Sequence, residues 1–230
     1  MGMYDIEIEG ANVKVSIVDD PGLVDTKMDE LRSSLLPQKN KIKKFITYFR
    51  KAFLKKKKSE RQVVGLDIKF VKTDENLNVG KYLLLCVGSY CLMIKLPDSD
   101  YISDTLGQFL SDETICFLGT GMSNKVSELG NFYFYTYGKM FRKYTFRVQQ
   151  RLSVNTGVEV GFLAAKILKK PNVENYGLAE LAGEVGMDIK EPIGECPDWN
   201  AKVFSDEEVK YAVHNAYTSY VIGNKLFGML

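Results

Sequence analysis

Alternating apolar and polar residues predict two β-hairpins in this chain. The first covers residues 3–18 and turns at a Gly-Ala-Asn sequence, a composition typical of hairpin turns. The second joins the apolar runs 81–88 and 90–96 through a tight Gly-Ser turn. Further strands are predicted at 63–70, where VVGLDIKF is rich in β-branched and aromatic residues, and at 114–121, where TICFLGTG ends in glycine.

Helical patterns alternate with these strands. Pro21 suits the first turn of a helix, Ser123 or Asn124 could cap another, and Ser205 with Glu208 forms a capping box. Strands that alternate with helices predict an α/β fold, in which helices cover both faces of a central sheet. The expected helices are residues 21–36, 98–112, 123–130, 158–170, 177–186 and 205–227.

One segment, residues 39–61, is strongly basic, with eleven Lys and Arg against a single Glu. The rest of the chain holds 20 basic and 28 acidic residues, so it is acidic. The apolar residues of the segment follow one helical stripe, and four interpretations remain open: binding to an anionic membrane surface, to a calmodulin-type partner or to nucleic acid, or docking on its own domain. Lys55, Lys56, Lys57 and Lys58 are its candidate phosphate contacts, and this run also suits nuclear import.

The composition indicates an ordinary soluble protein, with 45% hydrophobic and 26% charged residues. No apolar stretch approaches the ~18–20 residues that span a bilayer, and the first ten residues lack the apolar core of a signal peptide. The four cysteines form no CxxC pair and the chain has one histidine, so we expect reduced thiols in an intracellular protein instead of a zinc site. The expected location is the nucleus or the cytoplasm.

Six pieces of the sequence match one family in order: VVGLDIKF, LLLCVGSYCLMIKL, FLGTGMSNKVSEL, VEVGFLAAKIL, NYGLAELAGEVG and PDWNAKVFSDEEVKYAVHNAYTSYVIGNKLF. Through them the chain resembles the Werner-syndrome-like 3′–5′ exonuclease domains, plant branch, of the tyrosine-type DEDD superfamily. The resemblance implies a ribonuclease-H-like, three-layer α/β fold with a central mixed sheet of about five or six strands. It also implies an N-terminal hairpin and helix at 1–36, a basic amphipathic insertion at 37–62 and an exonuclease-like domain at 63–230.

The resemblance further implies a hydrolase whose carboxylates hold two Mg²⁺ or Mn²⁺ ions. The family's first motif, Asp-x-Glu, here contains Asp67 and Lys69. The Asp of the second motif aligns with Lys125, and the third motif, Tyr-x-x-x-Asp, contains Tyr211 and Asn215. Three of the four carboxylates are therefore replaced, and Asp67 alone could serve a residual metal site.

Two lysines at metal-ligand positions are expected to lie near Asp67 and to repel a divalent cation. Two unit charges ~4 Å apart interact by about 4 kcal/mol at an effective dielectric constant of ~20. We therefore expect no catalytic residues and no cofactor, with Mg²⁺ or Mn²⁺ relevant only to residual activity. Two functions stay open: an inactive exonuclease-like module that binds or regulates nucleic acid or protein, and an impaired 3′–5′ exonuclease acting on DNA or RNA.

Residues 131–151 depart most from the family, and about twenty residues look inserted there. Eight aromatic residues interleave with basic ones, and the alternation predicts two strands around Gly138. Arg142, Lys143 and Arg147 are candidate contacts to single-stranded or duplex nucleic acid. A protein partner, a homodimer interface or a plain structural hairpin are the alternatives.

Two residues close to the third motif are interpreted structurally. His214 is adjacent to Asn215 and is expected to be a histidine on the surface of the last helix. Trp199, in the sequence PDWN, is expected to pack just before that helix and not to stack on nucleic-acid bases.

Overall fold

The computed structural model describes residues 2–35, 62–72, 77–140, 144–192 and 196–230, without the side chains of 138–140 and 144–146. The basic helix predicted within 39–61, with Lys55–Lys58, lies outside the described residues, as do Arg142 and Lys143. Among the described residues, no helix is long and apolar enough to cross a membrane.

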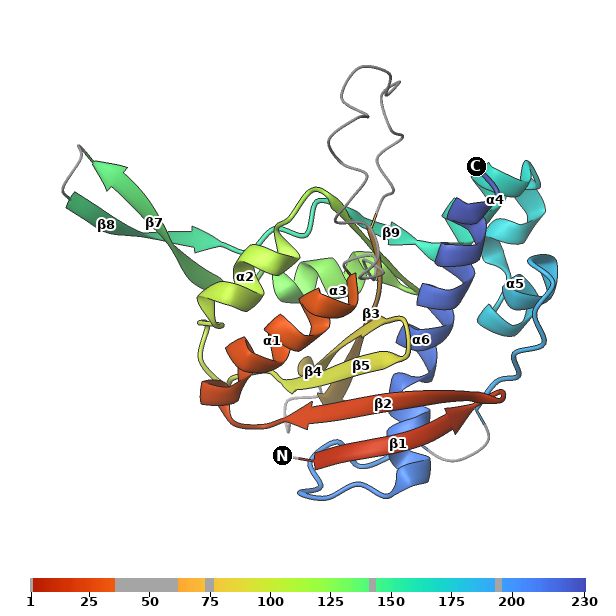
Figure 1. The fold of residues 1–230 in the computed structure, drawn as a ribbon, viewed down its shortest axis with the longest axis horizontal. Helices are drawn as coiled ribbons and strands as arrows, with labels where there is room; N and C mark the ends of the chain where they lie inside the picture. Colours follow the sequence, from red (N-terminus) through yellow and green to blue (C-terminus); the bar gives the residue numbers. More distant parts are fainter. Residues whose placement is uncertain (1, 36–61, 73–76, 141–143, 193–195) are drawn as a thin grey trace, which may run out of the picture.

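A mixed sheet of seven strands forms the centre of the fold, in the order β1-β2-β5-β4-β3-β6-β9 (Figure 1). The predicted α/β class is confirmed, and the sheet has more strands than the five or six expected because the N-terminal hairpin joins it: β2 pairs in parallel with β5. The strands are β1 (Gly2–Ile8), β2 (Ala11–Val18), β3 (Gln62–Lys72), β4 (Asn78–Val87), β5 (Tyr90–Lys95), β6 (Ile115–Gly119) and β9 (Gly157–Glu159).

Helices cover both faces of this sheet. Buried side chains of α1, α2 and α3 pack on one face, α6 packs on the other, and α4 and α5 pack against the C-terminal half of α6. The helices are α1 (Pro21–Leu35), α2 (Asp104–Leu110), α3 (Met122–Leu129), α4 (Val160–Leu168), α5 (Leu178–Glu184) and α6 (Asp206–Gly228), with a 3₁₀ helix at Pro171–Asn175.

Two expected helices begin later than their sequence patterns predicted. The helix expected at 98–112 covers only Asp104–Leu110, because Ser103 caps it by accepting a hydrogen bond from Leu106 N, and the preceding residues pair with another strand. The helix expected at 158–170 starts at Val160, because Gly157–Glu159 first form a strand beside β6. In both places pairing with a neighbouring strand takes the backbone groups that a longer helix would use.

Helix ends and turns follow local chemistry with two corrections. Ser205 and Glu208 form the predicted capping box of α6. Helix α3 begins after Gly121, which has φ 59°, so neither Ser123 nor Asn124 caps it. The first hairpin turns one residue earlier than predicted, at Glu9 and Gly10, which both have positive φ.

The thiol prediction is wrong for two of the four cysteines. Cys86 and Cys91 lie directly opposite each other on β4 and β5, with Cα atoms 4.2 Å apart, and form a disulfide. Directly opposite residues of antiparallel strands come this close, so the tight Gly88-Ser89 turn brings the two sulfur atoms together. Cys116 is buried and Cys196 is exposed.

Helix α6 approaches β3 closely at a glycine. A Cβ atom added to Gly65 would lie 1.8 Å from the carbonyl oxygen of Ala216 and 2.9 Å from the Cβ atom of Tyr220. Backbone atoms cannot move aside as the end of a flexible side chain can, so the position requires glycine. This contact fixes the depth at which α6 lies against the strand that carries Asp67.

We predict that Gly65→Ala lowers the free energy of unfolding by about 3 kcal/mol or more, at or above the usual cost of overpacking, because the added methyl group meets backbone. Chemical denaturation measures this. Gly183→Ala on α5 is the matched control, since nothing lies within 4 Å of its added Cβ atom, and it should stabilise the helix by about 0.5–1 kcal/mol. Equal stability of the two variants would contradict the close approach.

Candidate functional site: a buried carboxylate between two lysines

Three alternate residues of β3 point toward α6. Gly65, Asp67 and Lys69 are two residues apart and share one face of the strand, while Leu66 and Ile68 enter the core on the opposite face. Because Gly65 lets α6 lie close, Asp67 and Lys69 are both buried, with exposed fractions of 3% and 8%. A carboxylate and an ammonium group are thereby held between the sheet and a helix.

Asp67 forms ion pairs with two lysines. Lys69 Nζ lies 2.7 Å from Asp67 Oδ2, and Lys125 Nζ lies 2.5 Å from Asp67 Oδ1. The expectation that both lysines lie beside Asp67 is confirmed. Oδ2 has no well-directed hydrogen bond, so the contact with Lys69 is an ion pair at hydrogen-bonding distance, and each carboxylate oxygen faces its own ammonium group.

Two opposing effects set the pKa of Asp67. Burial would raise it, because desolvation disfavours the charged form, but the positive charges of Lys69 and Lys125 outweigh burial and hold the pKa below its usual value. Asp67 is therefore an anion at neutral pH. With both lysines charged, the cluster carries one excess positive charge.

The Lys69 ammonium group also lies between two aromatic rings. Its Nζ atom is 5.7 Å from the ring centre of Trp199 and 5.9 Å from that of Tyr211, within the range of cation–π attraction. Trp199 is buried and packs on Phe204 with ring centres 6.0 Å apart, as expected for a residue that precedes the last helix. The electron-rich faces of these rings offset part of the lysine's lost hydration.

Helix α6 supplies the other predicted positions. Tyr211 contacts Lys69, and Asn215 lies one turn further along the same side of α6, half-buried. The prediction that His214 lies on the helix surface is wrong, because its side chain is buried, with an exposed fraction of 4%. Burial also lowers the pKa of His214. Its Nε2 atom is buried without a hydrogen-bond partner among the described residues.

The start of α3 holds Lys125 in place through contacts that the sequence did not reveal. Lys125 Nζ donates a hydrogen bond to the carbonyl oxygen of Thr120, in the turn after β6. Glu159, at the end of β9, accepts hydrogen bonds of 2.9 Å from the backbone N–H groups of Gly121 and Met122. A carboxylate suits the N-terminus of a helix, but only the pairing of β9 with β6 brings Glu159 there.

The donor set does not fit a pair of divalent cations. Mg²⁺ and Mn²⁺ require several oxygen ligands, and no group of three or more His, Cys, Asp or Glu side chains suited to a metal occurs within the described ranges. Glu128, one turn beyond Lys125, accepts a 2.7 Å hydrogen bond from Gly80 N. The two oxygens of Asp67 face ammonium groups, which stand where cations would otherwise approach.

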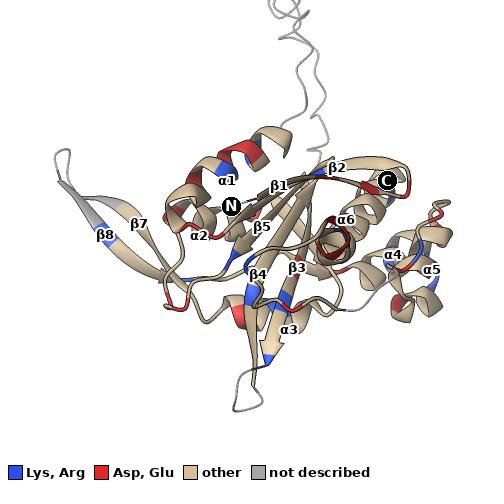
Figure 2. Cartoon of the chain, turned by 90° about the horizontal axis from the view of Figure 1, so that it is seen from below, with Lys and Arg blue, Asp and Glu red and all other residues tan. Residues whose placement is uncertain are grey.

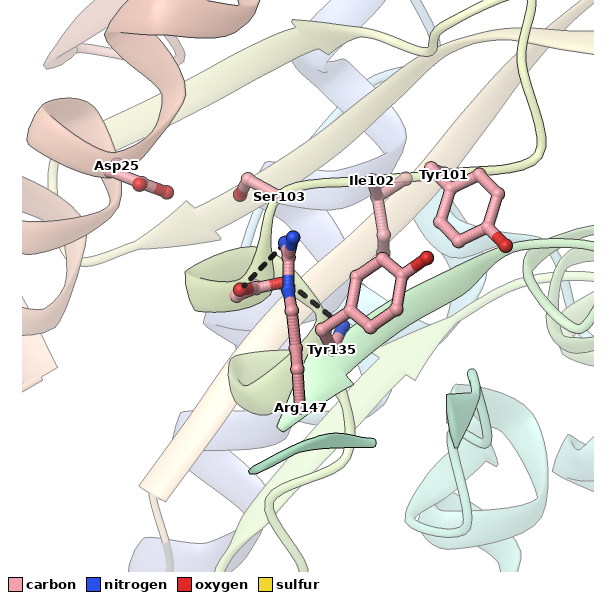
Figure 3. Close-up of a pocket in the computed structure, with 7 residues that line it drawn as sticks. Asp25, Tyr101, Ile102, Ser103, Tyr135 and Arg147 are labelled. Carbon is pink, nitrogen blue, oxygen red and sulfur yellow. Dashed lines mark hydrogen bonds and ion pairs between the residues drawn. The ribbon is translucent and has the colours of Figure 1, made fainter. Parts of the chain in front are cut away.

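Arg147 lies away from this cluster, in a pocket of about 290 Å³ at the base of the hairpin that β7 (Tyr133–Met140) and β8 (Tyr144–Arg151) form. Its guanidinium carbon stacks 3.9 Å from the ring centre of Tyr135, and its Nη2 atom lies 3.5 Å from Asp104 Oδ2 (Figure 3). The two predicted strands exist, but Gly138 lies within β7, where it pairs with Phe146, and not between the two strands.

Comparisons with known proteins identify the fold. No family model and no curated protein matches the chain. Among solved structures it resembles Escherichia coli RNase D, described as an exoribonuclease involved in structured RNA processing, with a TM-score of 0.58 and 16% identity over 94% of this chain and 44% of RNase D. It also resembles Brucella melitensis NrnC, with a TM-score of 0.53 and 16% identity over 73% of each chain. At these identities the likeness establishes the ribonuclease-H-like exonuclease fold.

We predict that Asp67→Ala destabilises the protein by about 3–5 kcal/mol, because it leaves two buried ammonium groups without their anion. Urea unfolding at neutral pH measures the loss. Lys170→Met is the control, since it removes the exposed ion pair of Lys170 with Glu184 and should leave stability nearly unchanged. An Asp67→Ala protein as stable as the wild type would contradict the buried ion pairs.

The same ion pairs predict a pH dependence. The pKa of Asp67 is depressed in the folded state, so its stabilising contribution is complete above the unfolded value of 3.8 and is lost as the pH falls below it. As the pH falls below 3.8, the wild type should therefore lose stability faster than Asp67→Asn, which cannot titrate. Parallel acid profiles of the two proteins would show that Asp67 is not held as an anion.

Proposed function

We propose that the chain is a catalytically inactive 3′–5′ exonuclease-like protein of the Werner-syndrome-like family, plant branch, that works as a nucleic-acid- or protein-binding or regulatory module. The exonuclease-like fold and the six matching sequence pieces support the family. The observation that carries the inactivity is that both oxygens of the buried Asp67 carboxylate face lysine ammonium groups.

Electrostatics explains why this arrangement opposes catalysis. Each ammonium group would repel a divalent cation ~4 Å away by about 8 kcal/mol, twice the value for two unit charges at an effective dielectric constant of ~20. Lys125 is tied to Thr120 and Lys69 lies against Trp199 and Tyr211, so neither is placed to swing aside. In a two-metal hydrolase the ions activate the attacking water and stabilise the leaving oxygen, so repulsion of the ions removes both contributions.

We predict that the purified chain releases no nucleotides from the 3′ ends of single-stranded or duplex DNA and RNA in Mg²⁺ or Mn²⁺. Product formation on denaturing gels measures this. Release that depends on metal and disappears in Asp67→Asn would instead identify an impaired 3′–5′ exonuclease. The Asp67→Asn variant replaces the carboxylate by an amide of nearly the same shape.

Restoring the three carboxylates tests whether the cleft has otherwise kept its shape. Lys69→Glu, Lys125→Asp and Asn215→Asp together should create a Mn²⁺ site, which electron paramagnetic resonance titration detects. The matched control is the same triple variant with Asp67→Asn, which should bind Mn²⁺ at least tenfold more weakly. If the folded triple variant binds no Mn²⁺, the assignment of these positions to metal-ligand motifs is wrong.

A further inference from the structure

The β7–β8 hairpin is an arm that projects from the body of the molecule, and Figures 1 and 2 both show it extending beyond α2. Its base is held firmly. The backbone of Tyr133 exchanges hydrogen bonds with Asp100 and Ile102, and Leu152 N donates to the carbonyl oxygen of Phe132. An isolated two-stranded hairpin is marginally stable in water, so a projecting arm indicates a surface that serves contact with another molecule.

The two faces of the arm differ in what covers them. Phe134 is buried on one face, where it fills the space beside Gly107 of α2. The opposite face consists of alternate residues of β7 and their partners on β8. Following the register, this tyrosine–arginine face contains Tyr133 opposite Arg151, Tyr135 opposite Gln149, and Tyr137 opposite Arg147.

Aromatic rings on the tyrosine–arginine face are already arranged in a stack. Tyr101 lies parallel to Tyr135 with ring centres 5.4 Å apart, and Arg147 lies against the Tyr135 ring from the other side in Figure 3. Further along the arm, Tyr137 is 64% exposed and the Arg147 side chain is 55% exposed. Tyr101 and Arg147 thus occupy both faces of the Tyr135 ring, and Tyr137, two residues and ~6.7 Å further along the strand, is the exposed ring left for a base.

The charge of the arm points to a polyanion. Residues 131–151 contain five Lys and Arg and no Asp or Glu, whereas the chain outside 39–61 and 131–151 holds 15 basic and 28 acidic residues. Figure 2 shows basic but no acidic positions along the described parts of β7 and β8. The acidic body repels a phosphate chain and the arm attracts it.

We propose that the tyrosine–arginine face of the arm binds single-stranded nucleic acid, with Tyr137 stacking on a base and Arg147 and Arg151 contacting phosphates. Aromatic rings interleaved with basic side chains are the usual platform for single strands, because every base has a face for stacking. This inference rests on the proposed function, because it names the ligand of the binding module. The binding surface is separate from the Asp67 cleft.

Fluorescence anisotropy of the full chain with labelled oligothymidylate and oligouridylate tests the proposal. The oligonucleotide with the lower Kd indicates whether the face prefers DNA or RNA. Tyr137→Ala should raise Kd about 5- to 100-fold, the range expected for one lost stacking contact, and Tyr137→Phe should restore binding. Arg147→Gln should reduce the slope of log Kd against log salt by about 0.7 per lost phosphate contact. Because Tyr137 is exposed, Tyr137→Ala should fold as the wild type does, and its melting temperature should be unchanged.

The chain provides a matched control on α4, which lies on the opposite side of the molecule from the arm in Figure 1. Phe162 is 43% exposed and has Lys166 over its ring at 5.2 Å, so it is another exposed aromatic–cation pair. Phe162→Ala should leave Kd unchanged. Each variant is also measured in a chain with Lys55–Lys58 changed to Gln, so that binding through that run does not conceal the effect.

Absence of oligonucleotide binding by the full chain would overturn the proposal, and so would unchanged affinity of Tyr137→Ala. A dimer in sedimentation that Tyr137→Ala dissociates, without an effect on oligonucleotide binding, would assign the face to a second copy of the chain and also overturn it. The proposed inactivity is judged separately, because metal-dependent nucleotide release in the same samples would refute inactivity while leaving the effect of Tyr137→Ala on binding intact.

Discussion

The ion pairs of Asp67 with Lys69 and Lys125 are the interaction on which the centre of the molecule depends. They join β3 to the start of α3, while the two aromatic rings beside Lys69 connect the same cluster to α6 and to the segment before it. A buried charge without a partner costs several kcal/mol. If β3 or α3 moved, Asp67 or one of the lysines would lose its partner, so the ion pairs hold these elements together. The close approach at Gly65 provides the geometry, because it brings α6 over the carboxylate.

This cluster is built from cations of the protein's own chain. In a metal-dependent hydrolase, several carboxylates repel one another until bound ions neutralise them. Here one carboxylate attracts two ammonium groups, and the rings of Trp199 and Tyr211 lie near the ammonium group of Lys69. The charge of the buried Asp67 carboxylate is therefore balanced by side chains of the chain itself.

Sequence patterns predicted the class of fold and most elements, because these depend on local periodicity, while the resemblance to the exonuclease family implied the cluster of Asp67 with two lysines. They missed features set by distant pairing. The helix expected at 98–112 is short since residues before Ser103 pair with β7, and Glu159 reaches α3 only because β9 lies beside β6. Burial of His214 and the disulfide between Cys86 and Cys91 likewise follow from packing and register, which composition alone does not encode.

The location of the positive charge also decides where a polyanion can bind. At the cleft, Asp67 neutralises one of two ammonium groups and both are largely buried, so little of their field reaches a ligand in solution. On the arm, the side chains of Arg147 and Arg151 are exposed. Arg147 pairs with Asp104 at 3.5 Å and Arg151 Nε donates a hydrogen bond to the carbonyl oxygen of Gly130, while the rest of the chain outside 39–61 is acidic. Electrostatic attraction therefore favours the arm over the Asp67 cleft. The binding proposed for the arm is independent of the Asp67 cleft, because stacking and phosphate contacts require no catalytic group.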